Sequence, residues 1–334
     1  MKNVDVVRAL CVLVIAIGFI FSSSAAAQQG EPKRAAARPI DPPDVYALTM
    51  FVRKELELIR LEMGKPAGRP SALKVKNAAP REVLFQALTL FRKTKRLCFE
   101  QLREHIEMPE VHRGKIRPAQ VHAVVDKVLT RLQNLKAGLG IKEKSEKTPR
   151  DASKTPTDVF RSIGEANRQL NVLIEKPFSP SDVFQQVTLG VGYAARLLAR
   201  FPGATRIPAA PKFERRKRPD DVFRRLVSCF ERCRAIAESA GLPLLELEAK
   251  RTEGLSPSDV YDVASLVVSE LAYLHAQLKD SPPPREVFQP GTKFPAHVYQ
   301  RAGLLESQLI QLEEVVGKNP DWLTQAQGTA VGDK

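Results

Sequence analysis

The sequence has few of the residues from which active sites and metal centres are usually built. Aromatic residues make up 6% of it, there is one tryptophan, and only five histidines are spread over 334 residues. No C-x-x-C-H haem-attachment site, H-E-x-x-H motif or glycine-rich phosphate loop occurs. These absences argue against a c-type cytochrome, a zinc protease and a nucleotide-binding enzyme. We therefore expect no catalytic residues, no metal and no cofactor.

Cysteine is also scarce, and its count is uneven. Of four cysteines, Cys11 lies in the apolar leader described below, which leaves Cys98, Cys229 and Cys233. Cys229 and Cys233 are four residues apart on one helix face, where their Cβ directions suit a mutual disulfide poorly. We expect three buried thiols that act as small apolar residues. The alternative is a disulfide from Cys98 to one of the other two.

Long hydrophobic runs are missing except at the start of the chain. Lys2 and Arg8 precede an apolar stretch of about 13 residues, and small residues follow it up to Ala27. This order predicts a secretory signal peptide over residues 1–27, with cleavage before Gln28. An uncleaved membrane anchor is the alternative. The stretch is short for a membrane span, which needs roughly 20 residues, so we predict a periplasmic or secreted protein without a transmembrane segment in its mature form.

Acidic residues are too few to balance the basic ones, and the formal net charge is +14. Such a charge attracts anionic partners over long range. Because export is predicted, we expect an acidic protein or an anionic envelope component rather than nucleic acid. The alternative is that the charge serves solubility only.

Proline, in contrast, is abundant and regularly placed. Eight times a proline is followed two residues later by a mostly polar residue, then by valine and usually by an aromatic residue. The eight prolines are Pro42, Pro80, Pro118, Pro156, Pro180, Pro219, Pro257 and Pro295. They are spaced 38, 38 and 38 residues apart in the first four copies and 39, 38 and 38 in the last four, with a gap of 24 between the sets. This pattern predicts a duplicated block of four units.

Each proline is expected to begin a helix, because its missing N–H would be unsatisfied at that position anyway. Asp41, Thr155, Ser179 and Ser256 directly precede four of the prolines and are suitable N-cap residues. The acid three residues after each of them completes a capping box. The repeated acidic residue therefore has a structural explanation, and we assign it no ligand.

Apolar or small residues then return at 3, 7, 10, 14 and 17 residues after the proline. In the last unit these are Val298, Ala302, Leu305, Leu309 and Leu312. Alternating steps of three and four place them along one helix face that packs against neighbouring helices. The fold class is therefore all-α: eight helix-plus-linker units with a period of about 38, forming two duplicated four-helix bundles. A continuous helical solenoid is the alternative.

The domain organisation follows from this repeat. We predict a flexible segment over 28–40, a first block over 41–178, a second block over 179–317 and a disordered tail over 318–334. About 15 residues link successive helices, enough to return along the helix, so parallel helices are allowed. Leu73–Lys76 and Leu244–Leu247 are candidates for short extended pieces on the bundle surface.

Two features are candidate binding sites. Gly190, Gly192, Tyr193 and Ala194 give the fifth helix an unusually small middle, which indicates either a close helix contact or a ligand pocket. The run Arg215, Arg216, Lys217 and Arg218 precedes the sixth helix and is a candidate docking patch. The leading hypothesis is an exported, non-enzymatic interaction or scaffold protein. A small-molecule sensor or carrier is the alternative, and an enzyme is disfavoured.

Overall fold

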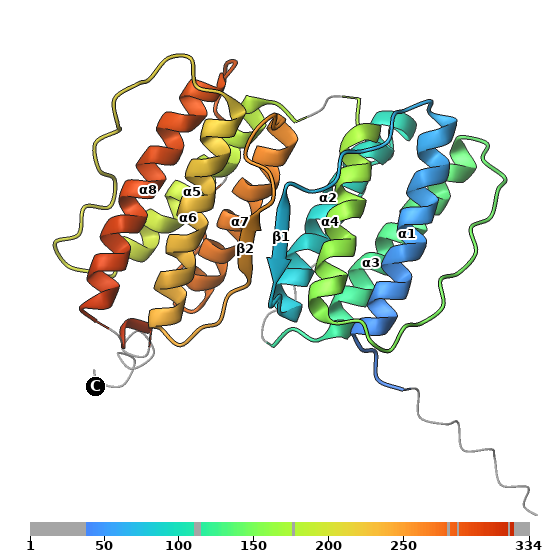
Figure 1. The fold of residues 1–334 in the computed structure, drawn as a ribbon, viewed down its shortest axis with the longest axis horizontal. Helices are drawn as coiled ribbons and strands as arrows, with labels where there is room; N and C mark the ends of the chain where they lie inside the picture. Colours follow the sequence, from blue (N-terminus) through green and yellow to red (C-terminus); the bar gives the residue numbers. More distant parts are fainter. Residues whose placement is uncertain are drawn as a thin grey trace, which may run out of the picture. The chain divides into compact units, whose positions relative to one another are not determined.

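The computed structural model describes residues 38–109, 115–175, 178–278, 281–285, 287–319 and 321–323. Within these ranges it contains eight helices and two short strands (Figure 1). The helices are α1 (Pro42–Glu62), α2 (Pro80–Leu102), α3 (Pro118–Gly138), α4 (Pro156–Leu173), α5 (Pro180–Leu198), α6 (Pro219–Ser239), α7 (Pro257–Ala276) and α8 (Pro295–Gly317). Every helix begins at one of the eight prolines, so the predicted helix starts are confirmed.

The polar residue two positions after each proline caps the helix start. In the four predicted capping boxes its side chain accepts a hydrogen bond from the N-cap backbone, as in Ser179 N–H to Asp182 Oδ2 at 2.8 Å and Ser256 N–H to Asp259 Oδ2 at 2.8 Å. The same bond forms where the N-cap residue has no suitable side chain, including Arg117 N–H to Gln120 Oε1 at 2.8 Å. The repeated motif thus satisfies a backbone donor that would otherwise be orphaned at each helix start.

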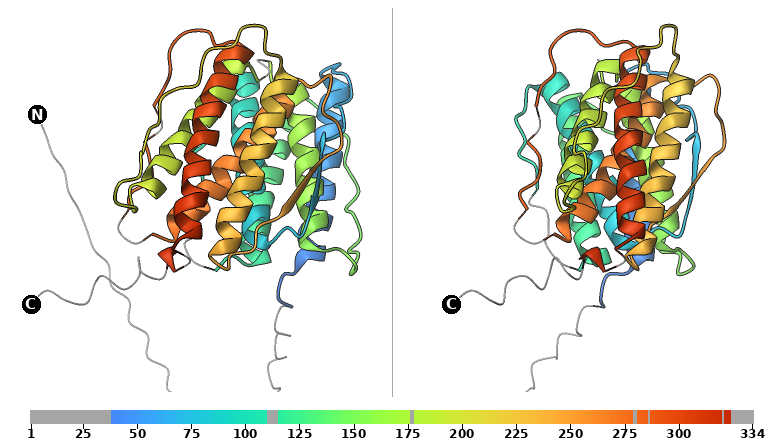
Figure 2. Two further views of the ribbon diagram at one scale, coloured as in Figure 1. Left: turned by 60° about the vertical axis from the view of Figure 1, so that its left-hand side comes forward. Right: turned by 90° about the vertical axis from the view of Figure 1, so that its left-hand side faces the viewer.

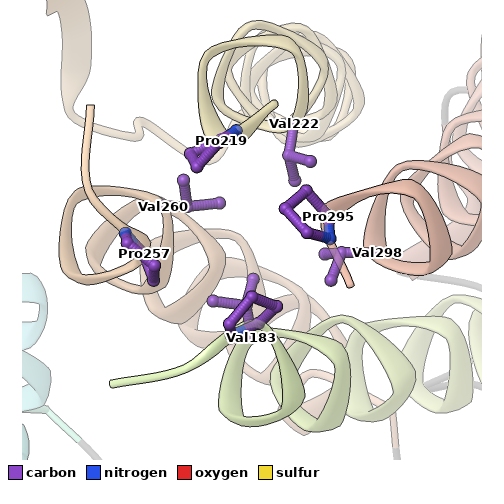
Figure 3. A pocket seen from close by; sticks show the side chains of 8 residues that line it. Val183, Pro219, Val222, Pro257, Val260, Pro295 and Val298 are labelled. Carbon is purple, nitrogen blue, oxygen red and sulfur yellow. The ribbon is translucent and has the colours of Figure 1, made fainter. Parts of the chain in front are cut away.

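The four helices of each block are parallel. The prolines and valines that begin α5 to α8 line one shallow apolar recess, in which Val183, Val222, Val260 and Val298 face one another (Figure 3). The corresponding residues of α1 to α4 line a second recess. Four aligned helix dipoles place partial positive charge at this end of each bundle. The capping carboxylates lie at this end and offset part of that charge.

Both bundles have the same helix order. α1 and α2 each pack against α3 and α4, and α5 and α6 each pack against α7 and α8. Each block therefore closes into a four-helix bundle in which the first two helices occupy opposite corners. The prediction of two four-helix bundles is confirmed, and closure of each block leaves no open stack of helices as a solenoid would have.

Long connections return along the outside of each bundle, as the parallel helices require (Figures 1 and 2). Two of them contain the strands β1 (Leu73–Lys76) and β2 (Glu246–Ala249), which pair antiparallel with Val75 opposite Leu247. A two-stranded ladder is marginal by itself, but the side chains of Val75 and Leu247 are buried. The extended segment expected over Leu73–Lys76 is β1, whereas the one expected over Leu244–Leu247 overlaps β2 only at its last two residues, and the pairing across the two blocks was not predicted.

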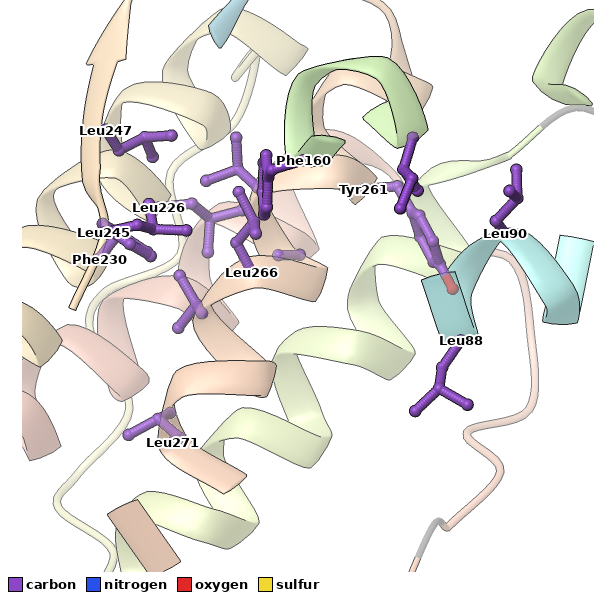
Figure 4. Packing of buried hydrophobic residues seen from close by; sticks show 14 of the residues in the cluster. Leu88, Leu90, Phe160, Leu226, Phe230, Leu245, Leu247, Tyr261, Leu266 and Leu271 are labelled. Carbon is purple, nitrogen blue, oxygen red and sulfur yellow. The ribbon is translucent and has the colours of Figure 1, made fainter. Parts of the chain in front are cut away.

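The predicted helix seams form the core. Val298, Ala302, Leu305, Leu309 and Leu312 are all at most 1% exposed. Burying a leucine contributes about 1.5–3 kcal/mol, so the eight seams together dominate the stability. The buried residues of both bundles form one connected cluster. Leu245 and Leu247 from the β2 segment belong to it and lie near Phe230 of α6 (Figure 4).

The structure corrects the prediction for the C-terminal segment. Trp322 and Leu323, placed in a disordered tail over 318–334, are 5% and 9% exposed and pack on the core. The Trp322 ring lies 6.0 Å from that of Phe201. The predicted signal peptide, most of the predicted segment 28–40 and residues 324–334 lie outside the described residues.

Candidate functional site

The junction between the bundles brings opposite charges together. Arg81 of α2 pairs with Glu270 of α7 at 2.8 Å. Arg168 of α4 pairs with Asp259 at 2.7 Å and with Asp262 at 3.0 Å, both on α7. The basic partners come from the first bundle and the acidic ones from the second. Sequence reasoning missed this arrangement, because the residues are about 90 to 190 positions apart and carry no local motif.

Arg81 connects two buried carboxylates at this junction. It also pairs with Glu82 at 2.8 Å, and its guanidinium lies 3.8 Å from the centre of the Tyr273 ring. Glu270 is fully buried, and this desolvation raises its pKa to about 7 against the opposing effect of Arg81. Burial raises the pKa of Glu82 as well. One arginine is thus shared by two carboxylates that water does not reach.

Burial has the opposite effect on the lysine of the junction. Lys93 of α2 is 3% exposed, and desolvation lowers the pKa of its ammonium group. Asp262 opposes this shift from 3.4 Å, and the rings of Phe178 and Tyr261 lie within 6 Å of the nitrogen. Removing one partner of such a buried ion pair destabilises the protein, because the remaining charge stays buried without compensation.

A cavity of about 130 Å³ opens beside this ion-pair network. Its walls come from β1, α2 and α4 of the first bundle and from α7 and Lys250 of the second. Gly164 forms part of the wall, and a Cβ atom added there would have no neighbour within 4 Å. Asn167 lines it from the same helix. This polar cavity is the strongest candidate for a small-molecule site in the described part of the chain.

A second candidate site is the end of the second bundle where its helices begin. Arg215, Arg216 and Arg218 are exposed there, whereas Lys217 is partly covered and pairs with Glu214 at 2.7 Å. Among the described residues, no carboxylate lies within ion-pair distance of the three arginines. The predicted basic patch is therefore exposed in the structure.

Aromatic residues lie next to this patch. Phe213 lies two residues before Arg215 in the chain, and Phe294 is the N-cap residue of α8. Both rings contact the ring of His297, at 5.1 and 5.8 Å between centroids. Phe213 is 39% exposed and Phe294 61% exposed. We call Phe213, Arg215, Arg216, Arg218 and Phe294 the basic–aromatic surface.

Neighbouring side chains occupy the space predicted for a ligand on the fifth helix. A Cβ atom at Gly190 would lie 3.3 Å from Leu305 of α8, and one at Gly192 would lie 3.0 Å from Pro284. Ala194 is fully buried, and the ring of Tyr193 packs edge-on against that of His275 at 5.5 Å. The small residues of α5 therefore allow α7, α8 and the connection between them to approach this helix closely. A close helix contact was one of the two interpretations that the sequence allowed.

The three cysteines are free and buried. The Cys98 thiol lies 4.0 Å from the Arg131 carbonyl within the first bundle, whereas the Cys229 thiol lies 3.9 Å from the Ala302 carbonyl within the second. The alternative of a disulfide from Cys98 to Cys229 or Cys233 is thus not formed. Desolvation raises the pKa of Cys98 to about 11 and raises those of the other two thiols further.

The class of protein is defined by these features: an all-α protein of two parallel four-helix bundles joined by a buried ionic junction. In the described ranges no three His, Cys, Asp or Glu side chains gather as a metal site would require, and none of the helices has the length and apolarity to cross a membrane. No family model, curated protein or solved structure matches this chain.

Proposed function

We propose that the protein is an exported, non-enzymatic interaction module that docks on an anionic membrane surface of the cell envelope. The observation that carries this proposal is the position of the basic–aromatic surface at the end of the second bundle. There, three exposed arginines that have no ion-pair partner within the described ranges lie beside two exposed phenylalanines. Arginines attract anionic headgroups, and aromatic rings favour the boundary between headgroups and acyl chains.

The surrounding structure supports the same assignment. The four helices of this bundle all begin at this end, where the capping carboxylates offset the positive ends of their dipoles, so the attraction for anions comes from the arginines. The recess between their first turns is walled by proline and valine side chains (Figure 3). An acidic protein would use the arginines but has no need of exposed Phe213 and Phe294. For this reason we favour a lipid surface over an acidic protein partner.

Vesicle co-sedimentation of the full-length protein tests this function. We expect binding to vesicles with about 30% phosphatidylglycerol in phosphatidylcholine, no binding to pure phosphatidylcholine, and release by high salt. Each basic residue near such a surface contributes about 1 kcal/mol. Changing Arg215, Arg216 and Arg218 together to glutamine should therefore weaken binding at least about tenfold.

Matched controls separate this surface from general basicity. Lys142, Lys144 and Lys147 are exposed in the connection between α3 and α4, so their triple change to glutamine removes the same charge and should leave binding intact. Changing Phe213 and Phe294 to serine should weaken binding without changing charge. Equal binding by the arginine variant, or equal binding to neutral vesicles, would refute the proposal. Charge-dependent binding that ignores the two phenylalanines would instead favour an acidic protein.

A further inference from the structure

The cavity between the bundles has the size and the chemical lining of a ligand site. Its volume of about 130 Å³ is close to that of an engineered cavity that holds benzene. A ligand enclosed there has on the order of six to ten non-hydrogen atoms. Unlike an apolar packing defect, this cavity is lined by charged and amide side chains as well as by Phe160 and Leu266.

One buried oxygen atom in the wall has no hydrogen-bond partner among the described residues. Asn167 is 2% exposed, and its amide nitrogen donates to both oxygens of Gln86, the backbone carbonyl at 3.3 Å and Oε1 at 3.4 Å. These two acceptors fix the orientation of the amide, because turning it over would set oxygen against oxygen. The remaining atom, Asn167 Oδ1, is buried without a hydrogen-bond partner among the described residues. A hydrogen-bond donor placed beside this oxygen would satisfy it.

Two opposite charges at the cavity, half-buried Glu165 and exposed Lys250, have no ion-pair partner among the described residues. Asp262 is neutralised by Lys93 and Arg168, and Lys74 pairs with Glu248 at 3.2 Å. In the described part of the chain, Glu165 accepts one long hydrogen bond of 3.4 Å, from the backbone of Ser71. No carboxylate lies within ion-pair distance of the Lys250 ammonium group in the described structure. One carboxylate and one ammonium group thus remain available to a ligand.

We propose that this cavity binds a small zwitterion of the size of an α-amino acid. The ligand's ammonium group donates to Asn167 Oδ1 and Glu165, and its carboxylate pairs with Lys250. A water molecule would satisfy Asn167 but would leave the half-buried Glu165 carboxylate without a cation. The site is built jointly by the two bundles, so an occupant stabilises their junction. This inference does not depend on the proposed membrane docking.

Thermal unfolding and calorimetric titration of the full-length protein test the site with defined probes. Glycine, L-alanine, L-serine and L-threonine carry both charges, whereas propionate and propylamine each carry one. We expect at least one zwitterion to raise Tm in a saturable manner and both single-charge probes to fail. Glu165→Gln and Lys250→Gln should each lower the affinity for that zwitterion at least about tenfold, as expected for loss of a charged hydrogen-bond partner.

Gly164 offers a control within the cavity wall itself. Gly164→Phe should fill the space and abolish binding, and Gly164→Ala should retain it. The proposal would be overturned if none of the four zwitterions bound at about 10 mM, a concentration that corresponds to a binding free energy of about −3 kcal/mol. Binding that persists in the folded Gly164→Phe variant, or equal binding of propionate, would do the same. Because these variants leave the basic–aromatic surface untouched, vesicle binding should be unchanged in all of them.

Discussion

Glu270 makes the stability of the bundle junction depend on pH. Its carboxyl group is fully buried, and its pKa is raised from 4.5 to about 7. Between these values the folded protein binds a proton that the unfolded chain releases, so stability falls as pH rises through this window. Each pKa unit corresponds to about 1.4 kcal/mol, and the whole shift therefore corresponds to about 3 kcal/mol lost between pH 4.5 and about 7.

The variant Glu270→Gln removes this titration while keeping the side-chain shape. At pH 5 the wild-type carboxyl is already neutral in the folded state, so the variant and the wild type should be about equally stable. At pH 8 the variant should be more stable, by about 3 kcal/mol, because the wild type then buries a second carboxylate beside Arg81. Urea unfolding at both pH values, followed by circular dichroism, measures the difference.

Glu248 supplies the control for this experiment. It is an exposed glutamate of β2 near the same junction, with 59% of its side chain accessible. Glu248→Gln should change stability little at either pH, because exposed ion pairs contribute at most about 1 kcal/mol. Two results would refute the account of a desolvated carboxylate. One is a Glu270→Gln variant that is less stable than wild type at pH 8; the other is a change in the free energy of unfolding that is the same at both pH values.

Three further predictions concern packing and the buried charges. Gly164→Ala should stabilise the protein by about 0.5–1 kcal/mol in urea unfolding, because alanine favours the helix and meets open space. Gly190→Leu should destabilise it by about 1–3 kcal/mol, since even a Cβ atom there approaches Leu305 to 3.3 Å. Arg168→Met should cost about 1–3 kcal/mol, measured in the same way, because Asp259 loses its 2.7 Å ion pair and keeps only the more distant Arg251 at 3.6 Å. An unchanged unfolding midpoint in any of the three would count against the packing described here.

Much of the architecture followed from local signals in the sequence. These signals act within a single helix. Proline at the first helical position and a polar capping residue two positions later specify where the helix begins, and the apolar seam specifies which face it buries. All eight helix starts and the buried seam of α8 could be predicted for this reason. The small residues around Gly190 left two readings open, and only the approach of Leu305 decided between them.

The candidate sites depended on the sequence to different degrees. The run from Arg215 to Arg218 could be found because its residues are adjacent in the chain. Its aromatic neighbour Phe294 could not, because it lies about 80 residues away and meets Phe213 only through His297. Trp322 was assigned to a disordered tail because its polar neighbours gave no periodic pattern, and its burial depends on contact with the core.

By itself, the sequence determined that this protein is a set of capped amphipathic helices in two blocks, since capping and helix periodicity are interactions between residues a few positions apart. The tertiary structure alone decided that the helices of each bundle are parallel, that β1 pairs with β2, and that Arg81, Lys93 and Arg168 meet the acids of α7. Those contacts join segments far apart in the chain. Their free energy comes from apolar burial and charge pairing, which exist only once both bundles have folded and packed together.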